Sequence, residues 1–434
     1  MLRIGILGAW RGGTLYDLAE QSGEATVVIC CDRRDFVLEL VRGKAERYGT
    51  SPVLTKDEEE FLSFPMDAAI LAGDAHDHAR QAIRLLERGV AVLSEVLPAK
   101  TPKEGVELVE TVEKTGGVYR YAENYCYLAQ VLEMRRLVKA GYLGAVEYLE
   151  TEYLHNCEDA WYFYTQGEEN HWRNRKDAFY YCTHSVGRAL YITDERPLFV
   201  TGFEPPYNDK MRRMGAKSAP FGLEIIRLTG GAIVKSLHGE TQKDSTRQVV
   251  YGSRGRAESF RYPVGKQDEI FVSTDEDPAH TSYEEDRYIP EEPERFASSA
   301  FLQEIKSKEN PHPNEAADVR MLLDFFRAVR GEEEEGIDVY RAMDMWLCGM
   351  FAFRSALSGE SVQRVPDFRK KEERDQYRFD EKSPFSDGEN RLPSLAGDPG
   401  KLPEKGVYVR QKSAYLRETK EYGRSAKAER RKKD

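Results

Sequence analysis

Near its amino terminus the chain reads Leu2-Arg3-Ile4-Gly5-Ile6-Leu7-Gly8-Ala9-Trp10-Arg11-Gly12-Gly13. Residues 2–7 form a short apolar run, which is typical of a buried strand and stops where the glycines begin. The glycines lead into Thr14–Ala19, which we interpret as the start of a helix. The stretch therefore predicts a strand, a glycine-rich turn and a helix in that order.

The glycine turn partly matches the dinucleotide fingerprint G-x-G-x-x-G. Gly8 and Gly13 stand at its first and third glycine positions, and Trp10 occupies the second. The fingerprint glycines allow a tight turn, approach of the backbone to a pyrophosphate, and packing of the helix on the strand. A glycine-rich turn is also common structural punctuation between a strand and a helix. The turn alone leaves both interpretations open.

An acidic residue supports the first interpretation. Asp32 closes the predicted strand Thr26–Cys31, 24 residues after Gly8. In dinucleotide-binding domains an acidic residue about 20 residues beyond the turn binds the ribose hydroxyls. Arg33 and Arg34 follow at once and would instead suit a 2′-phosphate, while the plainest alternative is a solvated turn. We expect NAD as the cofactor, with NADP as the less favoured choice.

Strands and helices alternate up to residue 122. Further strands are predicted at Asp67–Ala72, Val90–Ser94 and Val118–Ala122, and helices at Val37–Tyr48, His78–Arg88 and Glu104–Lys114. This alternation is typical of a parallel, doubly wound sheet. The sequence therefore predicts an α/β protein whose residues 1–122 form a Rossmann dinucleotide-binding domain.

The pattern changes after residue 122. Long strands are predicted at Val146–His155, Gly222–Leu228 and Ala232–Gly239, and helices at Leu128–Ala140, Glu315–Val329 and Val339–Leu357. A turn at residues 229–231 suggests a hairpin between the last two strands. We expect residues 123–366 to be a substrate-binding and oligomerisation domain of α/β type with a large open, mostly antiparallel sheet.

Residues 367–434 form a charged carboxy-terminal extension. Its last 34 residues contain 12 basic and 5 acidic side chains, although the whole chain is acidic. A charged segment of this kind is usually a mobile tail. The strand-like residues Val407–Val409 favour a second interpretation, an arm that lies on a neighbouring subunit.

The composition excludes several classes of protein. The 434 residues include 64 Lys+Arg and 75 Asp+Glu, a net charge of −11, so a basic footprint for nucleic acid is absent. The chain has no apolar run of about 18 residues, which a membrane-spanning helix would need. We therefore expect neither nucleic acid nor a membrane as a partner.

The cysteines indicate a reducing compartment. None of the six forms a Cys-x-x-Cys pair, and several lie in apolar runs, where free cysteine behaves as a small buried hydrophobe. Residues 1–3 run straight into the first strand, without a hydrophobic signal segment. Both features predict a cytoplasmic protein.

Two stretches carry a resemblance to a known family. The predicted strand at residues 67–72 runs into Gly73-Asp74-Ala75-His76-Asp77-His78, and a later stretch reads Gly89-Val90-Ala91-Val92-Leu93-Ser94-Glu95. They resemble the Gfo/Idh/MocA family of sugar-handling dehydrogenases, in which one strand leads to a His-bearing loop and the next ends in Glu-Lys-Pro. Here the residues are Glu95-Val96-Leu97-Pro98, so the family's usual catalytic lysine is replaced by Val96.

This departure is similar to a subgroup that contains NAD-dependent α-N-acetylgalactosaminidases, which carry Glu-Val-Pro at this place. Further similarities to that subgroup occur within residues 2–368, at Glu123–Tyr127, Glu152–His155, Trp172-Arg173, Tyr181–His184, Asp338–Tyr340 and Val365–Phe368. The resemblance implies an NAD-dependent oxidoreductase that transfers a hydride at a ring carbinol carbon of a sugar or glycoside. In the resembled glycosidases, oxidation, elimination and re-reduction together cleave the glycosidic bond.

Two alternatives stay open. One is a plain NAD(P)-dependent sugar or cyclitol dehydrogenase that releases NADH. The other is a non-catalytic sugar- or nucleotide-sensing protein of the same fold, which the missing lysine favours.

The base for a sugar hydroxyl must come from a side chain other than a lysine at position 96. Tyr153 and His155 lie two residues apart on a predicted strand, so their side chains face one side. Tyr180 and Tyr181 precede His184 by four and three residues, which places all three on one face if the chain is helical there. We expect His184 and Tyr153 to be the acid–base pair, and His155 and Tyr181 to line the sugar site.

The residues expected to hold the cofactor come from the turn, the strand ends and the resemblance. They are Gly8, Trp10, Arg11, Gly12, Gly13, Asp32, Arg33, Asp74, His76, His78, Glu95, Asn124, Trp172 and Arg173. His76 and His78 are spaced like metal ligands on a strand, but no Cys or carboxylate group completes a site, so no metal is expected. The expected partners are a small sugar or glycoside and further copies of the chain, as a dimer or tetramer.

Two aromatic features have two interpretations each. The run Trp161–Tyr164 is either part of a core or a sugar-stacking wall, and the surrounding polar residues favour the wall. His171 is either an exposed loop residue or part of the site.

Overall fold

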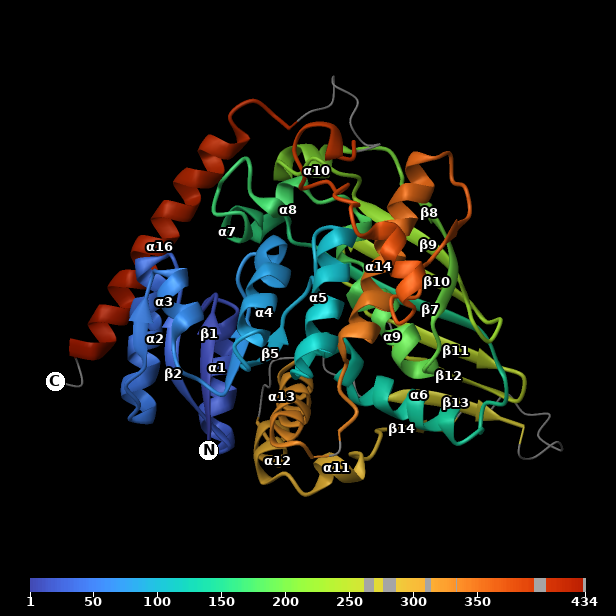
Figure 1. The fold of residues 1–434 in the computed structure, drawn as a ribbon, viewed down its shortest axis with the longest axis horizontal. Coiled ribbons are helices and arrows are strands. Elements are labelled where there is room, and N and C mark those ends of the chain that lie inside the picture. The colour runs from blue at the N-terminus through green and yellow to red at the C-terminus, as the bar shows by residue number, and fades with distance from the viewer. Residues whose placement is uncertain (261–268, 276–285, 309–313, 333, 394–402, 432–434) are drawn as a thin grey trace.

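The computed structural model describes residues 1–260, 269–275, 286–308, 314–332, 334–393 and 403–431. Its strands form two sheets, one of six strands near the amino terminus and one of nine strands. The six-stranded sheet lies at one end of the molecule and the nine-stranded sheet at the other (Figure 1). The predicted fold class is confirmed, while the predicted domain boundaries stay predictions.

The first sheet is parallel, in the order β3-β2-β1-β4-β5-β6. Its strands are β1 (Leu2–Leu7), β2 (Ala25–Cys31), β3 (Val53–Thr55), β4 (Ala68–Leu71), β5 (Ala91–Ser94) and β6 (Tyr119–Tyr121). Its helices are α1 (Gly12–Ser22), α2 (Asp35–Tyr48), α3 (Glu58–Ser63), α4 (His78–Leu86) and α5 (Pro102–Thr115). All the predicted elements of this region are present.

Two short elements of this region, β3 and α3, are absent from the sequence prediction. Strand β3 has three residues, too few to show a hydrophobic period. Helix α3 has six residues and begins with three glutamates, although Asp57 caps its start by accepting the N–H of Glu59. Only Phe61 and Leu62 of this helix are buried, so its apolar face is too small to be recognised.

The second sheet has the order β14-β13-β12-β11-β7-β10-β9-β8-β15. Its strands are β7 (Val146–His155), β8 (Pro197–Phe203), β9 (Phe221–Leu228), β10 (Ile233–Glu240), β11 (Gln248–Gly252), β12 (Gly255–Ser259), β13 (Ile270–Thr274), β14 (Asp286–Tyr288) and β15 (Gln363–Arg364). Neighbouring strands of this sheet pair antiparallel, except that β10 is parallel to β7. The predicted hairpin between β9 and β10 is present.

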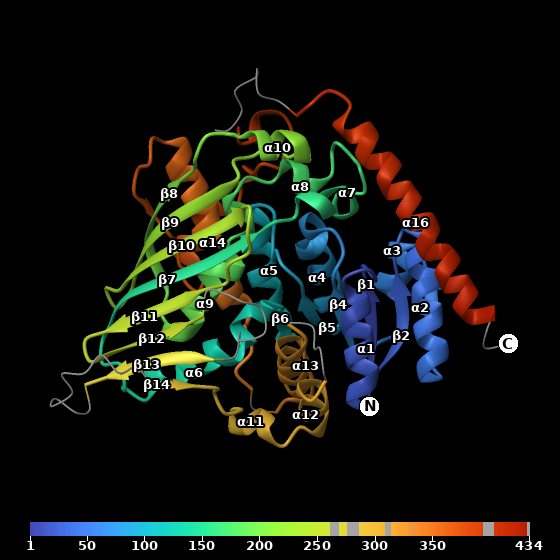
Figure 2. The ribbon, with the colours of Figure 1, turned by 180° about the vertical axis from the view of Figure 1, so that it is seen from behind.

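Helices cover one face of the second sheet. The long helix α14 (Val339–Leu357) lies against β8, and α9 (Thr183–Thr193) lies against β7 and β10 (Figures 1 and 2). The other helices are α6 (Ala129–Lys139), α7 (Trp161–Tyr164), α8 (Trp172–Arg175), α10 (Asp209–Met214), α11 (Glu294–Ala297), α12 (Ala300–Lys306), α13 (Glu315–Arg330), α15 (Lys371–Arg374) and α16 (Val407–Arg431). No helix in the described part of the chain is both long and apolar enough to cross a membrane, and the cytoplasmic location stays a prediction.

The turn after β1 uses its glycines differently from the predicted pattern. Gly8 has φ of +86°, and a Cβ there would overlap the backbone of Ala72 and Gly73. A Cβ at Gly12 would overlap the side chain of Ile6 on β1, so Gly12 is the glycine that lets the helix approach the strand. A Cβ at Gly13 would have only Lys44 Cε nearby, at 3.6 Å. The assignment of Gly13 to the helix-packing position is therefore wrong by one residue.

The carboxy-terminal extension ends in a helix, so the strand-like interpretation of Val407–Val409 is wrong. Helix α16 lies against α2 and α7 of the same chain (Figure 1). Tyr415 packs on Phe163, with 5.7 Å between ring centroids, and Tyr422 packs on Trp10 at 5.7 Å. Apolar contacts at helical spacing outweigh the strand preference of two valines. The structure thus attaches this segment to its own chain.

The attachment of α16 can be tested with one aromatic residue. Tyr415 is 6 % exposed, so Tyr415→Ala should weaken the attachment by about 3 kcal/mol. We expect faster limited proteolysis within residues 403–431 and a change in the fluorescence of Trp10. Val409→Ala, at a side chain that is 71 % exposed, is the control. Equal proteolysis of the two variants would contradict this packing.

Candidate functional site

Several of the predicted site residues line one cavity of about 910 Å³. It lies at the carboxyl ends of the parallel strands, where ligands of such sheets bind. The turn after β1 contributes Trp10 and Arg11, and the segments after β5 and β6 contribute Glu95 and Asn124. The second region contributes Tyr153, His155, Trp172, Arg173, Tyr181 and His184. The fold therefore brings predicted residues from both regions to one cavity.

The four residues predicted to act on the sugar form one cluster. The ring centroid of His184 lies 4.5 Å from that of Tyr153 and 5.1 Å from that of Tyr181. The ring of Tyr153 lies 4.9 Å from that of His155. Tyr153 and His155 come from β7, whereas His184 stands in the first turn of α9. The shared face of Tyr153 and His155 is present, and Tyr181 lies beside His184. The prediction is wrong for Tyr180, which is buried and donates its hydroxyl to the carbonyl oxygen of Lys100.

Glu123 orients His184. Its Oε1 lies 2.6 Å from His184 Nδ1 and also accepts the N–H of Tyr125. Because a carboxylate can only accept, Nδ1 carries the proton and Nε2 is left as the basic nitrogen. His184 Nε2 has no hydrogen bond within the described residues, and His184 lines the cavity. The pair is therefore arranged to accept a proton from a ligand.

Glu123 is absent from the predicted site, although a signal for it exists in the sequence. It follows β6 just as Asp32 follows β2 and Glu95 follows β5. Because carboxyl ends of parallel strands meet at one edge, a third acid at such a position is a site candidate.

Burial shifts the pKa values of the residues that surround His184, and the shifts keep these residues neutral. Burial raises the pKa of Tyr153 well above its ordinary value, so its hydroxyl is a proton donor at neutral pH. Burial likewise raises the pKa of Tyr181, although Arg173 opposes this. Burial lowers the pKa of His155, against the opposing effect of Asp244. The cluster therefore contains neutral tyrosines and a neutral His155 around the base.

A charged network joins the glycine turn to the second region. Arg11 donates to Glu95 Oε1 at 2.8 Å and to both oxygens of Asp318 at 2.9 Å, and Asn124 donates to the same carboxylate at 2.9 Å. Burial raises the pKa of Glu95, while Arg11 opposes the rise. Asp318, which lies on α13, is missing from the sequence prediction. Its only signal is a carboxylate on the apolar face of a predicted helix.

Removing Arg11 should destabilise the protein. Arg11→Met leaves two buried carboxylates unpaired, and breaking a fully buried pair costs about 3–5 kcal/mol. Because the Arg11 side chain is 35 % exposed, we expect the free energy of unfolding to fall by about 2–3 kcal/mol. Urea denaturation measures this loss. Arg33→Met is the control. It removes a single ion pair with Asp74, formed by a side chain that is 54 % exposed, and should lower the free energy of unfolding by less than about 1 kcal/mol. Similar values for both variants would contradict the importance of this network.

A second, connected groove follows the predicted cofactor residues. Its volume is about 250 Å³, and it is lined by Gly8, Asp32, Arg33, Asp74 and His171 among others. Asp32 accepts two hydrogen bonds from the Arg34 guanidinium, at 2.8 and 2.7 Å, and one from the Arg34 backbone N–H at 3.0 Å. His171 is 6 % exposed and its Nε2 lies 3.7 Å from Asp74. The interpretation of His171 as an exposed loop residue is therefore wrong.

Three of the predicted cofactor residues line neither cavity in the described part of the chain: Gly12, which packs on Ile6, and the two histidines His76 and His78. His78 is 1 % exposed, and its Nδ1 lies 3.0 Å from the carbonyl oxygen of Leu97, so it supports the loop after Glu95 from behind. His76 lies 3.6 Å from Asp77 and does not line either cavity in the described part of the chain. Both histidines follow β4 in sequence, His76 in the 3₁₀ turn Ala75–Asp77 and His78 at the start of α4.

The aromatic residues of α7 have divided roles. Trp161 is buried with Met211 and Met214, and its indole N–H donates to Asn174. Phe163 packs on Trp10, with 4.6 Å between centroids. Tyr164 lines the cavity. Trp161 and Phe163 are therefore core residues, while Tyr164 fits the predicted wall and Trp161 also lines a smaller neighbouring cavity.

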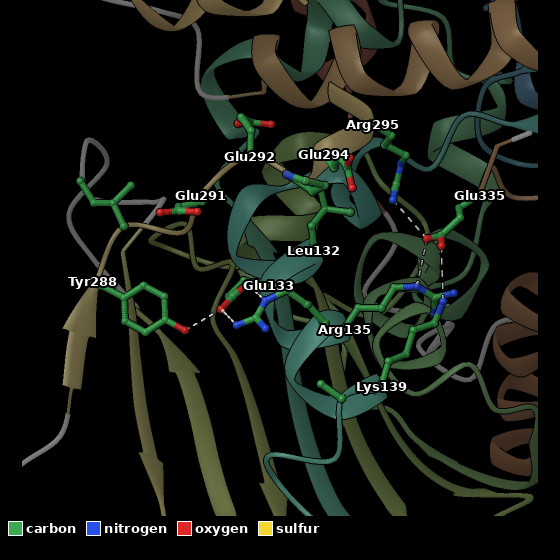
Figure 3. A pocket seen from close by; sticks show the side chains of 14 residues that line it. Leu132, Glu133, Arg135, Lys139, Tyr288, Glu291, Glu292, Glu294, Arg295 and Glu335 are labelled. Carbon is green, nitrogen blue, oxygen red and sulfur yellow. Dashed lines mark hydrogen bonds and ion pairs between the residues drawn. The ribbon is translucent and has the colours of Figure 1, made fainter. Parts of the chain in front are cut away.

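Another large cavity, of about 960 Å³, lies away from these residues, between α6 and the segment from β14 to α11 (Figure 3). Most of the charged side chains that line it form ion pairs or hydrogen bonds with one another. Glu133 accepts from Arg136 and Tyr288, and Glu335 pairs with Arg135 and Arg295. This pairing leaves little unmatched charge for a ligand. No group of three potential metal ligands occurs among the described residues.

The chain is similar in sequence to curated glycosidase-family proteins. It is 32 % identical over 185 residues to the glycosyl hydrolase family 109 protein 1 of Bacteroides fragilis, which covers 41 % of this chain and 35 % of that protein. It is 23 % identical over 385 residues to the alpha-N-acetylgalactosaminidase of Tannerella forsythia, covering 79 % and 80 %. The first alignment thus spans about a third of the relative's length. No family model matches the chain.

The fold matches a solved dehydrogenase. The structure of levoglucosan dehydrogenase in complex with NADH and levoglucosan superposes with a TM-score of 0.67 and 18 % identity, covering 84 % of this chain and 99 % of that one. The predicted resemblance is confirmed. The relatives bear glycosyl hydrolase family 109 names, and the structural neighbours are Gfo/Idh/MocA-type oxidoreductases.

Proposed function

We propose that the protein is an NAD-dependent oxidoreductase that transfers a hydride at a ring carbinol carbon of a sugar or glycoside. The observation that carries this proposal is the Glu123–His184 pair with Tyr153, in the same cavity as the glycine turn. The names of the relatives support it, as do the NADH and levoglucosan held by the solved dehydrogenase of the same fold.

The residues at the turn fit a dinucleotide. Gly8 brings its backbone against β4 with no room for a side chain, which keeps the turn open for a pyrophosphate. Asp32 lies at the end of β2, where a ribose hydroxyl would bind, and its carboxylate disfavours a 2′-phosphate. Gly8, Asp32, Asp74 and Trp172 would hold the cofactor. We therefore favour NAD over NADP.

The chain's own residues handle the protons. NAD, when bound, supplies hydride acceptance and return. His184 Nε2 accepts the proton of the sugar hydroxyl, and Glu123 stabilises the resulting imidazolium through Nδ1. The protonated Tyr153 donates to the oxygen on which negative charge develops. His155 and Tyr181 position the ring.

The same groups suit glycosidic cleavage. A ketone at C3 makes the hydrogen at C2 acidic, so a base can remove it. The electron pair then forms the C1–C2 double bond while the C1–O bond breaks, and the leaving oxygen takes a proton. Water adds across the double bond, and return of the hydride restores the hydroxyl at C3. The balance is hydrolysis without net consumption of NAD.

One experiment distinguishes the possible functions. The purified protein is analysed by mass spectrometry for retained NAD(H) and then incubated with p-nitrophenyl glycosides in deuterium oxide. Product deuterated at C2 without net NADH supports cleavage. Net NADH with an oxidised sugar indicates a plain dehydrogenase. Tight NAD binding without exchange on any glycoside indicates a sensing protein and contradicts the proposal.

We also propose a homo-oligomer formed through the nine-stranded sheet. Helices α9 and α14 cover one face of that sheet, and on the other face Phe199, Ile225 and Tyr251 are 37–38 % exposed. Large apolar side chains exposed on one face of a sheet favour association. Ile225→Glu should lower the mass measured by light scattering to that of a monomer, whereas Val362→Glu, at another exposed apolar residue, should not. A monomeric wild type would contradict this proposal.

A further inference from the structure

A small cavity of about 200 Å³ opens off the candidate sugar site. The two cavities share five residues: Tyr153, His155, Tyr164, Arg173 and Tyr181. The walls that belong to the small cavity alone include Cys157, Trp161, Lys176 and Glu240. A substituent of a sugar held at His184 could therefore extend into it.

Lys176 is a buried cation in this cavity. Its side chain belongs to a residue that is 8 % exposed, yet it makes no hydrogen bond or ion pair within the described residues. Its ammonium nitrogen lies 5.6 Å from the centroid of the Tyr181 ring. Lysine is almost never buried without a partner, because desolvating an ion costs several kcal/mol. Among the described residues, Lys176 therefore presents an unpaired ammonium group to the cavity.

Arg173 adds a second cation. Its guanidinium lies 4.4 Å from the Trp172 ring and 5.4 Å from the Tyr181 ring. No carboxylate lies within ion-pair distance of it in the described part of the chain. Contacts with the aromatic rings and a hydrogen bond to Tyr181 fix the guanidinium, and its other N–H groups stay available in their plane. Arg173 therefore presents preorganised donors to a ligand.

The nearby acids do not cancel these two charges. Glu240 lines the cavity and accepts the N–H of Cys157 at 3.1 Å, but it lies beyond ion-pair distance of Lys176. Asp177 accepts the N–H groups of Phe179 and Tyr180. Asp244 lies 3.5 Å from His155. Two cations and one carboxylate line the cavity, and its net charge is positive.

We propose that this cavity binds an anionic substituent of the sugar, a carboxylate or a phosphate, between Lys176 and Arg173. The substrate is then an acidic sugar rather than a neutral one, an inference that rests on the proposed function. A planar carboxylate or a phosphate accepts from both the guanidinium and the ammonium, which neutral hydroxyls match less well. Lys176 determines specificity and takes no part in the proton transfers at His184.

The test compares a neutral p-nitrophenyl hexoside, the matching hexuronide and the matching 6-phosphate, with the NAD-loaded full chain. We expect kcat/KM for one acidic substrate to exceed that for the neutral one at least about tenfold. Lys176→Gln should abolish this preference and change the neutral substrate less than about threefold. The hexuronide and phosphate arms identify which anion is bound.

Two further variants sharpen the result. Glu240→Gln removes the opposing charge and should increase the preference for the acidic substrate. Lys217→Gln is the control, because Lys217 pairs with Glu169 and lies outside both cavities. Equal effects of Lys176→Gln on neutral and acidic substrates would overturn the inference.

Binding is measured in parallel by calorimetry with free hexuronate and hexose 6-phosphate. Binding that depends on Lys176 without any hydride exchange would contradict the proposed function and leave the anion site standing. Turnover of neutral glycosides without binding of either anion would contradict the anion site alone.

Discussion

Replacing His184 by alanine is expected to lower the rate of hydride exchange between NAD and the sugar by about 10²–10⁴-fold, the usual contribution of a general base. The reason is geometric. Glu123 holds the proton on Nδ1, so Nε2 is the basic nitrogen at the cavity. The measurement is the transfer of deuterium from a labelled substrate to the cofactor. Added imidazole should restore part of the rate, because it can enter the space left by the ring.

NAD affinity should change little in this variant, since the glycine turn is untouched. A matched control is Tyr180→Phe. Tyr180 neighbours Tyr181 in sequence, but its hydroxyl donates to the carbonyl of Lys100, outside the cavity. This variant should lose some stability and keep its rate. An undiminished exchange rate in His184→Ala, or no rescue by imidazole, would contradict the role of His184.

Replacing Gly8 by alanine should abolish NAD binding, with a loss of at least about 100-fold in affinity. The φ of +86° costs an L-residue about 1–2 kcal/mol, and the new Cβ would overlap the backbone of Ala72 and Gly73. The turn must therefore move away from β4, which changes the surface that faces a pyrophosphate. Titration of NAD followed by tryptophan fluorescence measures the effect.

Gly13→Ala, unlike Gly8→Ala, should leave NAD binding intact. Gly13 lies in the first turn of α1, and a Cβ there has ordinary contact with Lys44 alone. We expect retained NAD binding and a gain of about 0.5 kcal/mol in unfolding free energy from the better helix former. Loss of binding in this variant would return the helix-packing role to Gly13.

Much of the site could be predicted because it lies at strand ends. Asp32, Asp74, Glu95 and Asn124 follow β2, β4, β5 and β6, and the ends of parallel strands meet at one edge. Glu123 was accessible to the same argument. The local sequence correctly predicted His78 as the start of a helix. It was misleading for His78 as a cofactor residue, because the side chain is buried with its Nδ1 3.0 Å from the carbonyl oxygen of Leu97.

Other features of the site and of the fold depend on contacts between segments that lie far apart in the sequence. Asp318 reaches Arg11 from 307 residues further along the chain, and no local pattern indicates that pair. Helix α16 shows the same limit. The strand preference of its first residues is weak, and its contacts with Trp10 and Phe163 are what stabilise the helical conformation.

The sequence by itself determined the parallel sheet, the open second sheet, the family resemblance and the set of residues that could handle protons. These follow from hydrophobic periodicity and from glycines and acids at fixed distances along the chain. Only the tertiary structure decided that Gly12 packs the helix, that Glu123 orients His184 and that Lys176 is buried without a partner among the described residues. Side-chain pairing and burial depend on which surfaces meet, and those surfaces come from segments too far apart for any local pattern to relate them.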